Sequence, residues 1–255
     1  MTRAVGLVLL IIITSVAIFA PMIAPYGPDA TTVDVLSPPS ADFLLGTDSL
    51  GRDVLSRIIY GTRISLQVGA AAAIVAVLIG APVGLVAGYF RGRIDFFLVQ
   101  LIDLFIALPG LVLALIITAM LGATVENLAI TLGVVTAPTV ARLVRGQVFV
   151  VRETLFVEAA KATGAKSMWI IRHHVLPNVA RVIWAQLAIN VSYAIFTSAS
   201  LSFLGLGVPP PAADWGSMVR DGASYLPILP FLSLGPGGAV ALTVFVFYLI
   251  GSDRK

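Results

Sequence analysis

Charged residues are scarce in this sequence and cysteine is absent. Only 11% of the 255 residues are Asp, Glu, Lys or Arg, whereas a soluble domain carries about 25%. Hydrophobic residues make up 58% of the chain, and the mean hydropathy is +1.01. A soluble fold of this size cannot bury so much apolar surface, because too much of the chain stays at its boundary with water. The composition therefore predicts an integral membrane protein.

The absence of cysteine excludes disulfides, cysteine-ligated zinc, iron–sulfur clusters and thiol nucleophiles. The two histidines, His173 and His174, are neighbours, and on a helix their side chains point about 100° apart, so they cannot readily share a metal ion. Residues 164–167 read Gly-Ala-Lys-Ser, but the earlier glycine of a phosphate-binding loop is missing. We therefore expect no metal site, no cofactor in this chain, no enzymatic activity and no nucleic-acid partner.

Six apolar runs are long enough, at about 20 residues, to cross the hydrocarbon core as helices. Arg3 precedes the first run, which resembles a signal peptide, but no clean cleavage site follows, so we favour an uncleaved membrane helix. The fourth run is expected to continue past Arg142 as a helix that protrudes into water. The sequence thus predicts an all-α, polytopic membrane protein with about six transmembrane helices. The runs cover residues 5–24, 64–89, 96–121, about 128 onward, 179–203 and 226–250.

Positive charge predicts the orientation, because Lys and Arg favour the cytoplasmic side of a membrane. With the N-terminus inside, twelve of the 16 Lys and Arg residues are cytoplasmic, whereas the reverse orientation leaves four there. We therefore expect both termini and the linker 151–178 inside, and the linkers 26–63 and 205–225 outside. The predicted inner charges are Arg3, Arg91, Arg93, Arg142, Arg145, Arg152, Lys161, Lys166, Arg172, Arg181, Arg254 and Lys255, and the outer ones are Arg52, Arg57, Arg63 and Arg220.

The chain is expected to divide in two at residue 63. Residues 1–63 would form an N-terminal membrane helix with an extracytoplasmic segment, and residues 64–255 the main transmembrane domain, with its cytoplasmic loop at 151–178.

That cytoplasmic loop predicts a helix–glycine–helix elbow. Residues 158–163 are helix formers that Gly164 can stop, while Ser167 can cap a second short helix that Pro177 would end. The apolar residues of the second helix either form a protein interface or pack on neighbouring helix ends, and the sequence leaves both interpretations open. These residues are Met168, Trp169, Ile170 and Ile171.

The same loop resembles the EAA loop of bacterial ABC importer permeases. The matching residues are Glu158, Ala159, Ala160, Gly164, Leu176 and Pro177, and His174 is usual in the peptide-importer branch. Further matches are residues 45–48 and 51–53, Asp103 with Pro109, residues 200–207, and Trp215 with Gly216. Together these motifs cover nearly the whole chain, and their order and spacing resemble the C-type permease subunit of dipeptide and oligopeptide importers.

The resemblance implies a type I ABC importer transmembrane fold in the bacterial cytoplasmic membrane. The elbow, including Met168, would be a coupling helix seated in an ATPase subunit, with Glu158 holding its base and Gly164 allowing its turn. The implied partners are a homologous B-type permease subunit, two ATP-binding cassette subunits that hold ATP and Mg, and an extracytoplasmic solute-binding protein that docks over 26–63 and 205–225.

Peptides are the cargo that the resemblance implies, although permeases for nickel or glutathione carry near-identical motifs. The alternative from another class is a secondary transporter or channel that works without ATPases. Such a protein is expected to carry a network of charges within the membrane.

A narrow polar stripe marks the fifth run. Its members fall within roughly 80° of one another on a helix, so they face either a water-filled pathway or a partner helix rather than lipid. Gln, Asn and Tyr are large for a tight helix interface, which favours the pathway. The stripe consists of Gln186, Asn190, Tyr193, Thr197 and Ser200.

Two further features lie in the second and third runs. Asp103 follows Asp95 by eight residues, about 12 Å into the membrane; without a charged partner in a neighbouring run, it is expected to hydrogen-bond to an adjacent helix rather than to relay protons. The second run carries glycine at 80, 84 and 88, a spacing that favours close helix packing. Prolines 82, 109 and 138 are expected to be tolerated as helix kinks.

Overall fold

The computed structural model describes residues 2–252, and their regular structure is helical, so the predicted all-α class is confirmed. Within these residues the only β-type pairings are two isolated bridges, Thr31–Arg52 and Thr47–Asp53. Arg254 and Lys255, which entered the orientation prediction, lie outside the described residues, as does the side chain of Arg3.

The elements follow the apolar runs closely, with one unpredicted helix, α10. They are α1 (Thr2–Ile18), α2 (Ala20–Ile23), α3 (Val54–Phe90), α4 (Gly92–Ala107), α5 (Gly110–Leu121), α6 (Val125–Arg152), α7 (Leu155–Ala162), α8 (Ser167–Ile170), a π-helical turn (Ile171–Val175), α9 (Leu176–Phe203), α10 (Trp215–Ala223) and α11 (Phe231–Ser252).

Four helical units in the described chain are long and apolar enough to cross a membrane: α3, α6, the unit Ser167–Phe203 and α11. The bent pair α4 and α5 gives a fifth if it counts as one span. These units correspond to five of the about six predicted spans, and the remaining one is the first run, which forms a shorter apolar helix. There α1 is 17 residues long, about 25 Å against a core of about 30 Å, because the helix breaks at Phe19 before Pro21.

The centre of the bundle is the contact of α3 with α6, and glycine makes it close. A Cβ at Gly80 would come within 2.4 Å of the Ala137 carbonyl oxygen, and one at Gly84 within 2.4 Å of the Ala141 carbonyl oxygen. At Gly88 the obstacle would be the Val148 Cβ, at 2.7 Å. The predicted packing role of these three glycines is confirmed, since any side chain there would push the two helices apart.

The three prolines differ in effect. Pro82 lies inside α3 and Pro138 inside α6, as the sequence predicted. Pro109 does more than kink its helix: α4 ends at Ala107, and α5 leaves at 87° to it. The extended backbone of Leu108, before a proline that has no N–H, explains the break.

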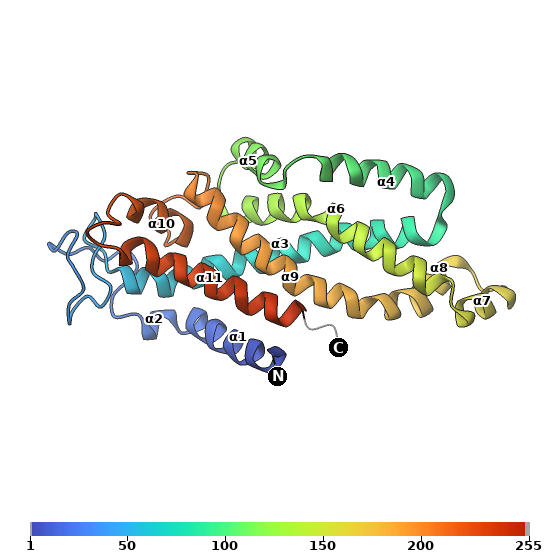
Figure 1. Cartoon of the computed structure of the whole chain (residues 1–255), viewed down its shortest axis with the longest axis horizontal. Coiled ribbons are helices and arrows are strands. Elements are labelled where there is room, and N and C mark those ends of the chain that lie inside the picture. The colour runs from blue at the N-terminus through green and yellow to red at the C-terminus, as the bar shows by residue number, and fades with distance from the viewer. Residues whose placement is uncertain (1, 253–255) are drawn as a thin grey trace.

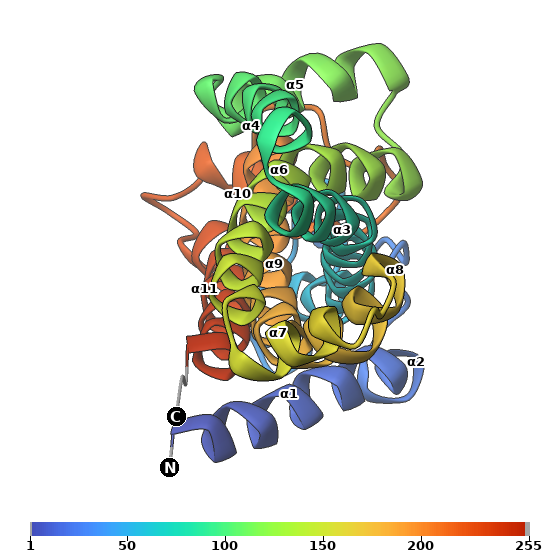
Figure 2. The ribbon, with the colours of Figure 1, turned by 90° about the vertical axis from the view of Figure 1, so that its right-hand side faces the viewer.

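The long axis of the molecule separates two specialised ends (Figure 1). The elbow helices α7 and α8 lie at one end, and residues 24–53 with α10 lie at the other. Helix α1 lies along the side of the bundle against α11 and α3 (Figure 2). Helix α3 starts at Val54, ten residues before the run predicted at 64, and Asp53 caps it through the Ser56 amide. Residue 63 thus lies within α3, and the division into two domains stays a prediction.

Candidate functional site

The elbow turns at Gly164 in a Schellman arrangement. The Gly164 amide donates to the Lys161 carbonyl (3.0 Å), and the Ala165 amide donates to the Ala160 carbonyl (3.1 Å). Gly164 has φ +82°, a left-handed conformation that a side chain disfavours. The prediction that Gly164 ends the first elbow helix, α7, is confirmed.

The second half of the elbow differs from the prediction. Ser167 is the first residue of α8 rather than its cap, and Lys166 at the cap position makes no side-chain capping bond. Pro177 does not end the helix: the chain passes through the π-turn into α9, with Pro177 in the first turn of α9. Pro177 has no N–H to donate to the preceding turn, and directly before it the Leu176 amide donates to the Ile171 carbonyl in the π-turn. The result is a continuous helical unit, Ser167–Phe203.

The packing interpretation is confirmed for two of the apolar elbow residues, and the interface interpretation stays a prediction for the exposed ones. Ile170 and Ile171 are buried in a cluster with Val157, Val144 and Val148, which fixes the elbow to the end of α6. The side chains that remain exposed form an apolar tip, and it consists of Leu155, Phe156, Met168 and Trp169.

The histidines support that tip rather than pair with each other. The His173 ring stacks on Trp169 with centroids 4.6 Å apart, and its Nδ1 lies 2.9 Å from the Trp169 carbonyl oxygen. A carbonyl only accepts, so the His173 Nδ1–H donates. His174 meets Trp169 edge-on and faces Phe156.

The other residues of the EAA pattern lie around the turn. Ala160 is half-buried against the core cluster, whereas Ala159, Leu176 and Pro177 are exposed. Glu158 is also exposed, and it forms no ion pair within the described part of the chain. Its role in holding the base of the elbow therefore stays a prediction.

A cavity of about 290 Å³ opens where α4, α5, α6 and α9 meet; its wall is mostly apolar, and it is called the polar cavity below for the amide and hydroxyl groups that this wall also carries. Three members of the predicted stripe line it: Gln186, Asn190 and Tyr193. The Gln186 Nε2–H donates to Asn190 Oδ1 at 2.9 Å, while Asn190 Nδ2 is buried without a hydrogen-bond partner in the described residues. The bend at Pro109 brings α5 to the cavity, where a Cβ at Gly110 would lie 3.0 Å from the Tyr193 hydroxyl.

The remaining stripe members do not line this cavity. Thr197 is almost fully buried. Ser200 donates to the Phe196 carbonyl and lines a separate apolar pocket between α9, α10 and α11. Two polar residues of the cavity escaped the sequence analysis, Thr136 and Thr139 on α6. Their three-residue spacing, continued by Arg142, was the available signal.

Asp103 forms an ion pair with Arg142, so the expectation that it lacks a charged partner in a neighbouring run is wrong. The expected hydrogen bond to an adjacent helix is confirmed, since Arg142 Nη2 donates to Asp103 Oδ1. Arg145 binds Asp95 with two hydrogen bonds, of 2.6 and 2.8 Å, between the same helices α4 and α6. The two residues of each pair are 39 and 50 positions apart in the sequence, so no local sequence pattern could indicate the pairing.

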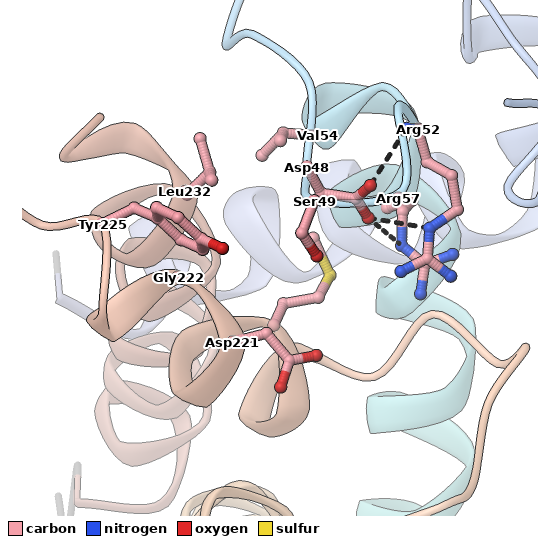
Figure 3. Close-up of a pocket in the computed structure, with 10 residues that line it drawn as sticks. Asp48, Ser49, Arg52, Val54, Arg57, Asp221, Gly222, Tyr225 and Leu232 are labelled. Atoms are coloured by element: carbon pink, nitrogen blue, oxygen red, sulfur yellow. Dashed lines mark hydrogen bonds and ion pairs between the residues drawn. The ribbon is translucent and has the colours of Figure 1, made fainter. Parts of the chain in front are cut away.

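The end of the molecule opposite the elbow is organised around Arg57. Its guanidinium donates to the carbonyls of Pro28 (2.7 Å) and Ala212 (3.2 Å), which ties two segments far apart in sequence. Beside it, Asp48 accepts from Arg52 Nε at 2.7 Å (Figure 3). The small pocket there holds about 30 Å³, room for a water molecule rather than for a transported solute.

Another buried charged side chain, that of Asp214, lies at this end of the molecule. Asp214 caps α10 by accepting from the Ser217 amide. Its burial raises the pKa of its carboxyl group, against the opposing effect of that hydrogen bond.

Two family descriptions match the chain. Residues 80–252 match the binding-protein-dependent transport system inner membrane component, and residues 3–39 match the N-terminal TM domain of oligopeptide transport permease C.

Relatives cover almost the whole sequence. A dipeptide transport system permease protein, DppC, of Alkalihalophilus pseudofirmus is 39% identical over 252 residues, 98% of this chain and 83% of that protein. A glutathione transport system permease protein, GsiD, of Pectobacterium atrosepticum is 38% identical over 254 residues, 99% of this chain and 84% of that protein.

A solved structure shares the fold. A chain of the MetNI methionine ABC transporter superposes with a TM-score of 0.64, over 77% of this chain and 93% of that one, at 18% identity.

Proposed function

The chain belongs to the family of binding-protein-dependent transport system inner membrane components, the permeases of ABC importers, and from that premise we propose that it imports di- and oligopeptides. The solutes in the names of two relatives, dipeptide and glutathione, are both peptides. Glutathione is therefore a competing cargo of the same chemical class, and nickel is a competing cargo of a different class.

The observation that carries the coupling role is the elbow. An apolar tip with Met168 68% exposed and Trp169 47% exposed stands at the end of the molecule, and exposed apolar groups of this kind mark protein interfaces. The elbow is also fixed to α6 through Ile170 and continuous with α9. A partner that moves the tip therefore moves two helices that line the polar cavity.

The partners that we propose are those of an ATP-driven importer. Two ATP-binding cassette subunits grip the elbow, a B-type permease subunit completes the pathway, and an extracytoplasmic binding protein docks on the end formed by residues 24–53 and α10. ATP and Mg belong to the cassette subunits. This arrangement requires both termini and the elbow to lie in the cytoplasm of a bacterial cell.

Co-purification tests the coupling role. Met168→Asp should reduce recovery of the ATPase subunits with the permease complex, because it introduces a charge into the apolar tip. Met168→Leu, of similar volume and polarity, is the matched control and should retain them. Uptake that is unchanged by Glu158→Lys or Gly164→Pro, or a complex that never contains an ATPase, would contradict the proposal and favour a transporter independent of ATP.

A further inference from the structure

The ion pair of Asp103 with Arg142 continues the wall of the polar cavity. Asp103 precedes Ile106 by three residues on α4, and Arg142 follows Thr139 by three on α6; Ile106 and Thr139 both line the cavity. Residues three apart share a helix face one turn apart. Since α6 runs toward the elbow and α4 away from it, the pair lies on the elbow side of the cavity, where a solute would leave.

The pair is open, unlike its neighbour. The Asp103 and Arg142 side chains are 49% and 52% exposed, against 16% and 26% for Asp95 and Arg145. A single hydrogen bond joins Arg142 Nη2 to Asp103 Oδ1. Arg145 instead donates two hydrogen bonds, one to each carboxylate oxygen of Asp95. Hydrogen-bonding capacity therefore remains on both Asp103 and Arg142 toward the open side.

Lipid does not explain this exposure. Arg142 lies 17 residues after the start of α6 at Val125, about 25 Å along a helix that is long enough to span the membrane. This position is about 5 Å short of the far side of a hydrocarbon core of about 30 Å. Half-exposed charges there face water, the membrane interface or another protein chain, because contact with lipid tails is costly.

We propose that Asp103 and Arg142 form a zwitterion-selective exit from the cavity. A solute's carboxylate binds the Arg142 guanidinium and its ammonium group binds the Asp103 carboxylate, so one internal ion pair is exchanged for two with the solute. Every charge stays paired during the exchange, which avoids the cost of an unpaired charge. A singly charged solute would leave one member of the pair unpaired. The inference rests on the proposed import of peptides, which carry both charges at their ends.

Thiol labelling in the assembled transporter tests this exit. The chain has no cysteine, so Thr139→Cys gives this subunit a single reporter inside the cavity. Alanyl-alanine, added from the elbow side, should slow the reaction of that cysteine with a water-soluble methanethiosulfonate reagent. The uncharged N-acetyl-alanyl-alanine amide should not. Asp103→Asn or Arg142→Gln should raise the alanyl-alanine concentration for half-protection about tenfold or more, the effect of losing one charge-assisted contact.

The controls separate binding from folding. Glu153, at the end of α6, forms a separate exposed ion pair with Arg91. Glu153→Gln removes that pair and should leave the protection unchanged. Asp103→Asn/Arg142→Gln leaves neither charge unpaired, so its complex should elute as the wild type does while protection is lost. Protection by the uncharged peptide, wild-type protection in the double variant, or a Thr139→Cys side chain that never reacts would each overturn the exit. Failure of ATP-driven uptake for every solute would instead overturn the proposed function.

Discussion

Gly84 on α3 lies against Ala141 on α6 so closely that a Cβ on the glycine would come within 2.4 Å of the Ala141 carbonyl oxygen. Because that oxygen belongs to the backbone, no rotamer change can relieve the contact. Gly84→Ala should therefore force α3 and α6 apart and destabilise the fold by about 1–3 kcal/mol. The melting temperature in detergent measures this loss. Gly238→Ala on α11, where a Cβ meets nothing within 4 Å, is the control and should melt no lower than the wild type, because alanine favours a helix over glycine.

Gly164 should be needed for its backbone conformation alone. A Cβ would meet no atom within 4 Å at Gly164 or at Gly146, but only Gly164 has a positive φ. Gly164→Ala should cost about 1–2 kcal/mol of strain and lower ATP-driven uptake by misplacing the elbow. Gly146→Ala should instead stabilise α6 by about 1 kcal/mol. Equal uptake by the two variants would argue against a conformational role for Gly164.

Arg57 should hold the outer segments together. Arg57→Met leaves the partly buried carbonyls of Pro28 and Ala212 without their donor, at a cost of about 0.5–1.5 kcal/mol for each lost hydrogen bond. Limited proteolysis should then cleave residues 24–53 faster. Arg220→Met is the matched control, because that side chain is 42% exposed and its ion pair is with adjacent Asp221. Equal cleavage of the two variants would contradict the assignment.

Asn190 and Thr197, the second and fourth members of the polar stripe, should respond differently to substitution. Asn190→Leu replaces a cavity-lining amide with an apolar group of similar size, so it should slow uptake while the complex still assembles. Thr197→Leu adds volume at a nearly fully buried position, so it should reduce assembly itself. Size-exclusion chromatography and uptake, measured on the same preparations, separate these effects. Normal assembly with slow uptake in Thr197→Leu would restore Thr197 to the pathway.

Asp214 should make stability depend on pH. Burial raises the pKa of its carboxyl group above the usual value of 3.8, so the folded protein binds the proton more tightly than the unfolded chain does. The Asp214 contribution to stability therefore grows as pH falls through the raised pKa, and it is lost as pH rises.

Asp214→Asn keeps an oxygen that can cap α10 through the Ser217 amide but removes this titration. Its melting temperature relative to the wild type should increase from about pH 4.5 to about pH 7.5. A difference that stays constant across this range would refute the proposed titration.

Local patterns in the sequence sufficed for much of the fold. Hydropathy located the apolar runs, because a lipid-facing helix must be apolar along its length. The glycine spacing at 80, 84 and 88 identified the closest helix contact, and Gly164 marked the end of α7. Each of these signals operates within a few residues of chain.

Features that depend on distant partners could not be predicted. Arg142 is 39 residues from Asp103, and Arg57 is more than 150 residues from the Ala212 carbonyl that it binds. The sequence at Pro109 is compatible with a kink or a break, and the structure has a break, with α5 packed against α6 and α9. Pro177 likewise permits either a helix end or a helix start.

The continuous helix from Ser167 to Phe203 determines how far a rotation at the elbow displaces the residues of the cavity. Its 37 residues make a rod of about 55 Å, so a rotation of about 5° about one end displaces the other by about 5 Å. The π-turn and Pro177 lie between Trp169 and Tyr193, but the helix continues through both. Tyr193 lies about 36 Å along the helix from Trp169, so a rotation of about 5° at the elbow end displaces it by about 3 Å, roughly the width of a water molecule.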